Sequence, residues 1–508
     1  MTSTAPAGAV FLSILPLLAE AVSGQRRRAF IGVQRHLSSA PRRTGAAHQH
    51  ETLPIARHRY VARDTVSIFL IAASGSVGRR AFVKNRFNLV HIAVAVLVTA
   101  AAMLLLGNLS AGEKKIDTRV ESLYGVTDPQ YLRSMGVLLG PTIIEGNTVK
   151  HLENGAEIFP AMLEAIRSAR ETITFETYIY WSGDIGKQFA EALRERAQVG
   201  VKVHVLLDWI GSAKMDEALL EEMRKGGVEV ERYHKPHWLN LTRMNNRTHR
   251  KLLIVDGQVG FTGGVGIADQ WDGNAQDKEH WRDSHFMVRG PAVSEFQAVF
   301  LDNWIKATGR VLHSGDYFPK IDNAGKMPAQ MFSSSPTGGS ESMHLMYLLS
   351  IASARQSILL SSSYFVPDDL AINALVEAAK RGVKIRIITP GEDIDASVVR
   401  HASRARWGEL LEAGIVIAEY QPTMFHCKIM IVDGFMVSTG STNFDNRSFR
   451  LNDEANLNVY DAGFAAEMTR EFEQDFAKTR AITIEQWRNR PWKEKVIEHA
   501  SSLLGKQL

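Results

Sequence analysis

Two stretches of the sequence are closely related: HRKLLIVDG at residues 249–257 and HCKIMIVDG at residues 426–434. Both follow the pattern H-x-K-x4-D, and both contain the apolar run that is typical of a buried β-strand. The dipeptide Asp-Gly at the end of each run predicts a hairpin turn. One H-x-K would carry little information, but two full copies indicate an internal duplication.

The alternation of side chains along a strand divides the motif residues into two groups. Residues i and i+2 point to the same face, so the histidine and the lysine of each motif share a face, namely His249 with Lys251 and His426 with Lys428. Asp256 and Asp433 have the opposite parity and directly precede the turn glycines. This position favours a structural role over proton transfer for the two aspartates.

The residues before each motif repeat as well. Residues 173–179 and 358–365 are β-prone, and each is followed by an amphipathic helical stretch, a Gly-Val-Lys turn and another apolar strand. Such strand–helix–strand units form right-handed parallel crossovers. We therefore predict an α/β fold of two pseudo-symmetric halves packed together, residues 145–310 and 343–490. The Pro-, Gly- and Ser-rich residues 311–342 predict a linker between them.

A site that contains both motifs combines two imidazoles with two ammonium groups, which suits phosphoryl chemistry. The lysines would neutralise the non-bridging oxygens of a phosphodiester, one neutral histidine would attack phosphorus, and the other, protonated, would donate a proton to the leaving alcohol. Small residues follow each motif and let backbone N–H groups approach an anion. We expect substrate contacts from Gly263, Gly264, Ser441 and Asn443.

We expect neither a metal nor a cofactor. The chain has one cysteine, which excludes a multi-cysteine zinc or iron–sulfur site. Few carboxylates share the parity of the site, and two neighbouring lysines would repel a cation. Cys427 lies between His426 and Lys428, so strand parity points it away from the site and predicts a small core residue.

The net charge of +4 is unevenly distributed along the 508 residues. Residues 1–86 hold 13 of the 59 Lys+Arg and 3 of the 55 Asp+Glu, a balance of +10. The other 422 residues hold 46 basic and 52 acidic side chains, a balance of −6. A mildly acidic body argues against a nucleic-acid partner.

The basic end adjoins the most apolar stretch of the chain, FNLVHIAVAVLVTAAAMLLLGNL at residues 87–109. About 20 apolar helical residues span a bilayer, so we predict a single transmembrane helix; a buried core helix is the alternative. Basic residues within 79–86 favour a cytoplasmic N-terminus, but Lys114 and Lys115 leave the side of the catalytic body open. We predict that residues 1–80 form a basic, disordered leader. Whether these residues are translated is open.

The two H-x-K-x4-D motifs and their surroundings resemble the phospholipase D superfamily, which is named for its paired H-K-D motifs. The likeness covers residues 145–490. The resemblance implies a phosphohistidine intermediate and no metal, with His249 as the nucleophile and His426 as general acid and then base. It implies a catalytic set of six motif residues: His249, Lys251, Asp256, His426, Lys428 and Asp433. The superfamily usually carries an asparagine after each Gly pair. Asn443 fits this pattern, whereas Gly266 departs from it, so the phosphate-binding donors of the two halves are unequal.

The superfamily also carries an acidic residue downstream of each motif histidine, where it orients an imidazole. Asp283 and Glu454 stand at these places. A carboxylate in this position fixes the tautomer of a histidine and stabilises its charged form. A surface location is the alternative for both residues.

Three segments resemble the bacterial cardiolipin synthases within the superfamily: ETYIY at residues 176–180, NFDNRSFRLN at 443–452 and WRNRPW at 487–492. This resemblance implies a phosphatidyltransferase in the bacterial inner membrane that makes cardiolipin from two phosphatidylglycerols and releases glycerol. Its partners would be a phospholipid membrane and phosphatidylglycerol, with no nucleic acid. A lipid hydrolase or head-group exchanger and a phosphodiesterase or nuclease are alternatives in the same superfamily. A non-catalytic lipid-binding protein is an alternative from another class.

Two further segments each allow two interpretations. Residues 234–247 have no counterpart in the second half and predict either a lipid-facing lip around Trp238 or an ordinary packed loop. Residues 491–508 predict an amphipathic segment, which would either lie on a membrane surface or pack on the core.

Overall fold

The structure is a computed structural model that describes residues 91–103 and 116–503, with gaps at 117, 123, 234, 236–245 and 337–341, together with residue 505. The described residues all lie within residues 79–508, one of the two units into which the chain divides. The leader predicted for residues 1–80 and most of the segment 234–247, with Trp238, lie outside the described residues.

The apolar stretch near the N-terminus is described in part. Residues 91–103 form a helix, and the remainder of 87–109 lies outside the described residues. None of the described helices is long and apolar enough to cross a membrane. The transmembrane span over 87–109 therefore stays a prediction.

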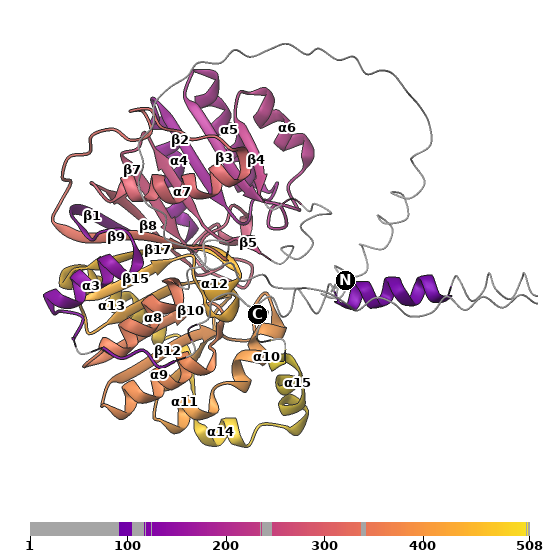
Figure 1. Ribbon diagram of the computed structural model, residues 1–508, viewed down its shortest axis with the longest axis vertical. Helices are drawn as coiled ribbons and strands as arrows, with labels where there is room; N and C mark the ends of the chain where they lie inside the picture. The colour runs from indigo at the N-terminus through magenta and orange to yellow at the C-terminus, as the bar shows by residue number, and fades with distance from the viewer. Residues whose placement is uncertain are drawn as a thin grey trace, which may run out of the picture. The chain divides into compact units, whose positions relative to one another are not determined.

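The body is built on one mixed sheet of 16 strands that runs through both halves (Figure 1). The first half supplies β1 (Ile144–Glu153), β2 (Thr172–Thr177), β3 (Lys202–Asp208), β4 (Glu229–Tyr233), β5 (Arg247–Thr248), β6 (Leu252–Val255), β7 (Val259–Gly263) and β8 (Ser284–Arg289). The connecting region supplies β9 (Met327–Ser334). The second half supplies β10 (Ser357–Ser362), β12 (Lys384–Pro390), β13 (Val416–Tyr420), β14 (Lys428–Val432), β15 (Met436–Gly440), β17 (Asn452–Tyr460) and β18 (Thr479–Ile482).

The order of the strands is β18-β13-β12-β10-β14-β15-β17-β9-β1-β8-β7-β6-β2-β3-β4, with β5 paired to β17. The short strands β11 (Phe365–Val366) and β16 (Phe444–Asp445) form a separate pair. The predicted α/β fold of two equivalent halves is confirmed, because the order of the second half mirrors that of the first on either side of β9 and β1.

Helices connect the strands in both halves. They are α3 (Pro129–Leu139), α4 (Asn154–Ser168), α5 (Asp184–Gln198), α6 (Glu217–Lys225), a 3-10 turn (Asp269–Trp271), α7 (Val293–Thr308), α8 (Ser342–Ser353), α9 (Asp369–Lys380), α10 (Ser397–Ala405), α11 (Gly408–Glu412), α12 (Asn446–Arg450), α13 (Ala462–Phe476), α14 (Ile484–Arg488) and α15 (Trp492–Ser502). The predicted crossovers are β2–α5–β3 and β10–α9–β12, and each pairs its two strands in parallel. Each motif strand, β6 or β14, then pairs antiparallel with the first strand of its crossover.

The region 311–342, for which we predicted a linker, differs from a plain connection because it contains β9. This strand pairs with β1 on one side and with β17 on the other, so it joins the two halves into one sheet (Figure 1). Its residues Ala329, Met331 and Phe332 are fully buried. Pro and Gly residues within and around β9, such as Gly325, Pro328 and Pro336, favoured the prediction of a linker and concealed this short strand.

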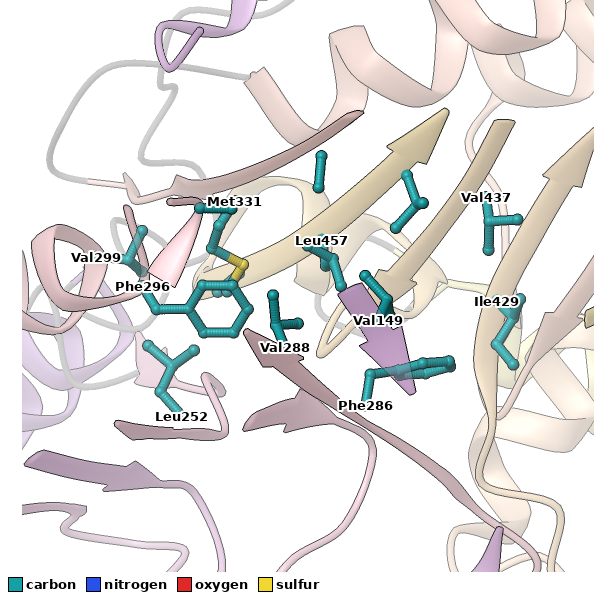
Figure 2. Close-up of a cluster of buried hydrophobic side chains, with 14 of the residues drawn as sticks. Val149, Leu252, Phe286, Val288, Phe296, Val299, Met331, Ile429, Val437 and Leu457 are labelled. Carbon is teal, nitrogen blue, oxygen red and sulfur yellow. The ribbon is translucent and has the colours of Figure 1, made fainter. Parts of the chain in front are cut away.

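A hydrophobic core at the junction draws on both halves. Figure 2 shows Val149 of β1 and Phe286 of β8 beside Leu457 of β17 and Ile429 of β14. All four side chains are less than 9% exposed. Burial of apolar surface on this scale is the main force that holds the halves together, and the relative position of the two motifs depends on it.

The helix α15 lies within residues 491–508 and shows both characters considered for that segment. Its Glu498 is buried and accepts hydrogen bonds from Arg404 of α10, at 3.0 Å, and from Arg490, at 2.5 Å. Trp492 and Val496, in contrast, are 70% and 58% exposed. One side of the helix therefore packs on the body while the other presents apolar side chains.

Asp256 and Asp433 occupy equivalent turns at the ends of the motif strands. Each has a positive φ of 51°, and each carboxylate accepts hydrogen bonds from three consecutive backbone N–H groups that lead into the first crossover strand. Asp256 binds residues 170–172 and Asp433 binds residues 355–357, at 2.7–3.1 Å. Both aspartates therefore tie the motif hairpin to the start of the neighbouring strand.

We predict that Asp256→Ala lowers the free energy of unfolding by about 1–3 kcal/mol, because three N–H groups lose their acceptor. Asp256→Asn should lower it less, since asparagine tolerates positive φ and retains one acceptor oxygen. Denaturant unfolding of the purified variants measures both changes. A fully stable Asp256→Asn protein that is catalytically dead would contradict the structural role.

Candidate active site

Both H-x-K segments reach the junction between the halves, where each is held by backbone contacts from the opposite half. The N–H of His249 donates to the carbonyl of Asp453, at 2.9 Å, and the N–H of His426 donates to the carbonyl of Arg282, at 2.8 Å. Asp208, at the end of β3, also accepts a hydrogen bond from the N–H of Thr248 at 3.0 Å. The loops before the histidines are therefore fixed by residues far away in the sequence.

Each histidine pairs with a buried carboxylate from the other half. His249 Nδ1 lies 3.1 Å from both oxygens of Glu454, and His426 Nδ1 lies 2.7 Å from Oδ2 of Asp283. Both carboxyl groups are fully buried, and burial acts to raise their pKa. The adjacent histidine and the motif lysines outweigh burial, so the pKa of each carboxyl is lowered and both stay ionised.

Further donors hold the two carboxylates in place. Glu454 accepts hydrogen bonds from Ser441 Oγ, at 2.5 Å, and from Asn452 Nδ2, at 3.1 Å. Asp283 accepts one from the indole N–H of Trp271, at 2.8 Å. Ser441, which we expected to contact substrate, therefore bonds to the carboxylate behind His249 instead.

Gly263 and Gly264 also lie behind the site and do not line its cavity. A Cβ atom on Gly264 would lie 2.1 Å from Oδ1 of Asp283, and one on Gly263 would lie 2.6 Å from Cα of His285. Gly263 also has a φ of 156°. The glycines that we expected to approach an anion thus give room for Asp283 and its strand.

Asn443 and its counterpart Gly266 both line the cavity. Asn443 Oδ1 accepts a hydrogen bond from Ser363, at 2.6 Å. A Cβ atom on Gly266 would lie 2.8 Å from Cβ of Ile179 and 3.1 Å from the ring of Trp271. The departure from the superfamily pattern at Gly266 therefore has a steric reason, because neighbouring side chains fill the space that an asparagine would need.

The two motif lysines are buried beside the histidines. Lys251 Nζ donates to the carbonyl of His249, at 2.8 Å, and Lys428 Nζ donates to the carbonyl of His426, at 2.7 Å, and to Ser363, at 2.6 Å. Burial, and then the proximity of Lys428, lower the pKa of Lys251 to about 7. Burial also lowers the pKa of Lys428. An incoming anion would therefore favour the protonated form of each lysine.

Burial lowers the pKa of both histidines, to about 4 for His249 and about 3 for His426. Both are therefore neutral at neutral pH while the site is empty. A phosphate would add negative charge and favour the imidazolium form of one of them. This environment allows one histidine to act as a nucleophile and the other to gain a proton when an anionic substrate binds.

A cavity of about 470 Å³ opens onto His249, Lys251 and His426. Its wall also includes several residues to which the sequence motifs assigned no individual role: Tyr178, Arg247, Trp271, Trp281, Tyr364, Asp395 and Arg447. Arg247 could have been found, since it precedes His249 by two residues and shares its strand parity. A hollow of about 560 Å³ at α8 and α9 contains none of the motif residues.

The metal-ligating side chains are dispersed in the part of the chain that the structure describes. There, no three His, Cys, Asp or Glu residues come together in an arrangement that could hold a metal ion. Cys427 is buried in the junction core, with Sγ 3.7 Å from the hydroxyl of Ser284. The positive charge in the cavity comes from lysine and arginine side chains.

Two equivalent α/β halves that each bring one H-x-K pair to a shared cavity define a phospholipase D-like protein. Comparisons with known proteins agree with this class. The family model described as "Cardiolipin synthase, PLD-like domain" matches residues 162–304 and 347–476. The solved phosphatidylserine synthase of Haemophilus influenzae Rd KW20 is similar in fold, with a TM-score of 0.57 and 14% identity over 74% of this chain and 100% of that one.

Curated relatives define the family more narrowly. The cardiolipin synthase of Geobacillus kaustophilus (strain HTA426) is 37% identical over 357 residues, which cover 70% of this chain and 71% of the relative. Cardiolipin synthase 1 of Staphylococcus aureus (strain MRSA252) is 35% identical over 368 residues, or 72% and 74% of the two chains. The chain belongs to the cardiolipin synthase family of phospholipase D-like phosphatidyltransferases, as its motifs predicted.

The pKa of Lys251 leads to a pH prediction for anion binding. Lys251 is protonated below about pH 7 and loses its charge above it, so the affinity for sulfate should fall by up to about tenfold per pH unit above pH 7. Calorimetric titration of the protein with sulfate from pH 6 to pH 9 measures this. Lys251→Met should bind sulfate weakly with a much flatter pH profile. An unchanged slope in this variant would show that another group titrates.

Proposed function

We propose that the enzyme transfers the phosphatidyl group of one phosphatidylglycerol to a second phosphatidylglycerol, forming cardiolipin and releasing glycerol. The observation that carries this proposal is the pair of histidines, each held by a carboxylate of the opposite half, with two buried lysines at one cavity. Membership of the cardiolipin synthase family supports the choice of lipid.

In the first step, neutral His249 attacks the phosphorus of the donor. Its Nδ1 faces Glu454, which leaves Nε2 as the nucleophile. A P–N bond forms, the bond between phosphorus and the glycerol oxygen breaks, and protonated His426 gives its proton to that oxygen. Asp283 stabilises the imidazolium before the transfer.

In the second step, the acceptor hydroxyl gives its proton to His426 and attacks phosphorus. The P–N bond breaks, and His249 regains its neutral form. Lys251 and Lys428 stabilise the non-bridging oxygens in both steps. This sequence returns both histidines to their starting states and conserves every proton.

A phosphatidyl–histidine intermediate makes this function testable. Rapid acid quenching with phosphatidylglycerol labelled in its phosphate should leave label on the peptide that contains His249, stable to alkali and labile to acid. Excess ethanol should divert label into phosphatidylethanol, because the second step needs only a hydroxyl group. His249→Ala is the matched control and should retain no label. Label on the His426 peptide would reverse the two roles, and the absence of both label and alcohol exchange would refute the two-step route.

We further propose that residues 87–109 anchor the enzyme as a single-pass helix in the bacterial inner membrane, and that the halves extend over residues 145–310 and 343–490. The described helix of residues 91–103 supports the anchor, because its large apolar side chains are exposed: Ile92, Val94, Val96, Leu97, Val98 and Met103 are each more than 50% exposed. Apolar surface exposed on this scale favours a lipid environment over water.

Truncation before residue 114 tests the anchor. The full chain should stay in the membrane fraction through a high-salt wash, while the truncated chain should be released in large part. Asp256→Asn in the full chain controls for loss of stability. A truncated chain that still needs detergent for extraction would place the anchor elsewhere, for example on the exposed face of α15.

A further inference from the structure

The cavity holds cations at two depths. Lys251 lines the cavity beside His249 and is only 4% exposed, and Lys428, 3% exposed, lies behind the wall beside His426. Arg247 and Arg447 are half-buried and line the same cavity, and the exposed Lys214 lines it as well. The arginines are therefore closer to the opening. Guanidinium groups bind phosphate oxygens in pairs of hydrogen bonds, so this second layer is suited to another phosphate.

The arginines break the symmetry of the duplication. Met424 stands two residues before His426, where the first half has Arg247, and it is buried and apolar. Gln270 follows Gly266 by four residues, where the second half has Arg447 after Asn443. The histidines and lysines are thus present twice, but each arginine is present once. The cavity consequently has one symmetric phosphate centre and one additional cationic group of residues.

The two guanidinium groups are close enough to influence each other. Burial is the main cause that lowers the pKa of Arg247, and Arg447 lowers it further, while Asp208 and Tyr178 act in the opposite direction. Both arginines act to lower the pKa of Tyr178. The ring of Tyr178 lies 5.3 Å from that of His249. Both arginines therefore line the cavity on the side of Tyr178 and His249.

We propose that Arg247 and Arg447 bind the phosphodiester of the acceptor phosphatidylglycerol while its free hydroxyl reaches the phosphorus at the histidine pair. This proposal rests on the function proposed above, which requires two phosphodiesters in one cavity although only one reacts. In the acceptor, three carbon atoms separate the attacking hydroxyl from the phosphate oxygen. Arg247 and His249 are two residues apart on an extended segment, about 7 Å, which is a compatible spacing.

The test compares two acceptors that differ in their phosphate. With phosphatidylglycerol in detergent micelles and labelled free glycerol, one reaction yields both cardiolipin and labelled phosphatidylglycerol from the same donor. Arg247→Gln with Arg447→Gln should lower the rate of cardiolipin formation by at least about tenfold, the loss expected for hydrogen bonds to a charged group. Glycerol exchange should change by less than about threefold, because glycerol carries no phosphate.

Two further variants sharpen the comparison. Arg447→Lys should restore part of the cardiolipin rate, and Arg133→Gln, which removes an exposed arginine on α3 that bonds to Gln130, should change neither rate. An equal fall in both reactions would assign the arginines to the donor or to folding and would overturn the proposal. Unchanged rates of both reactions would overturn it as well. A wild-type protein that exchanges glycerol but makes no cardiolipin would instead refute the proposed function, before any variant is compared.

Discussion

A carboxylate from one half of the molecule holds the histidine of the other half, and this exchange occurs twice. Glu454 lies in the second half and orients His249, while Asp283 lies in the first and orients His426. Neither half contains a complete histidine–carboxylate pair of its own. The chemistry therefore depends on how the halves dock, and β9, which pairs with strands of both sides, fixes that docking.

The symmetric centre lies in asymmetric surroundings. Next to His426 are the rings of Trp271 and Trp281, at 5.3 and 5.7 Å, whereas Tyr178 lies next to His249 at 5.3 Å. Aromatic walls exclude water and strengthen the electrostatic interactions at the site. A reaction between two copies of one lipid requires a distinct place for each copy. The different aromatic walls around the duplicated phosphate centre provide these two places.

The sequence predicted those features that local pattern controls. The Asp-Gly dipeptides placed the aspartates at the turns, where Asp256 and Asp433 each hold three backbone N–H groups, and the repeated crossovers defined the α/β halves. Features that depend on docking had no local signal. The strand β9 was concealed by its Pro- and Gly-rich surroundings, and Ser441 bonds to Glu454 rather than facing the cavity. The resemblance to a known family supplied Asp283 and Glu454, but their exchange between halves became visible only in the structure.

The number of phosphate-like ions that bind per chain tests most directly whether both halves form one composite site. Calorimetric titration with tungstate of the full chain carrying Arg247→Gln and Arg447→Gln, which lacks the second cationic group, should give one ion per chain, and the further change of either His249→Ala or His426→Ala should abolish that binding. Two ions per chain, or one ion whose affinity survives the loss of either histidine, would show that each half holds its own site and would contradict the account.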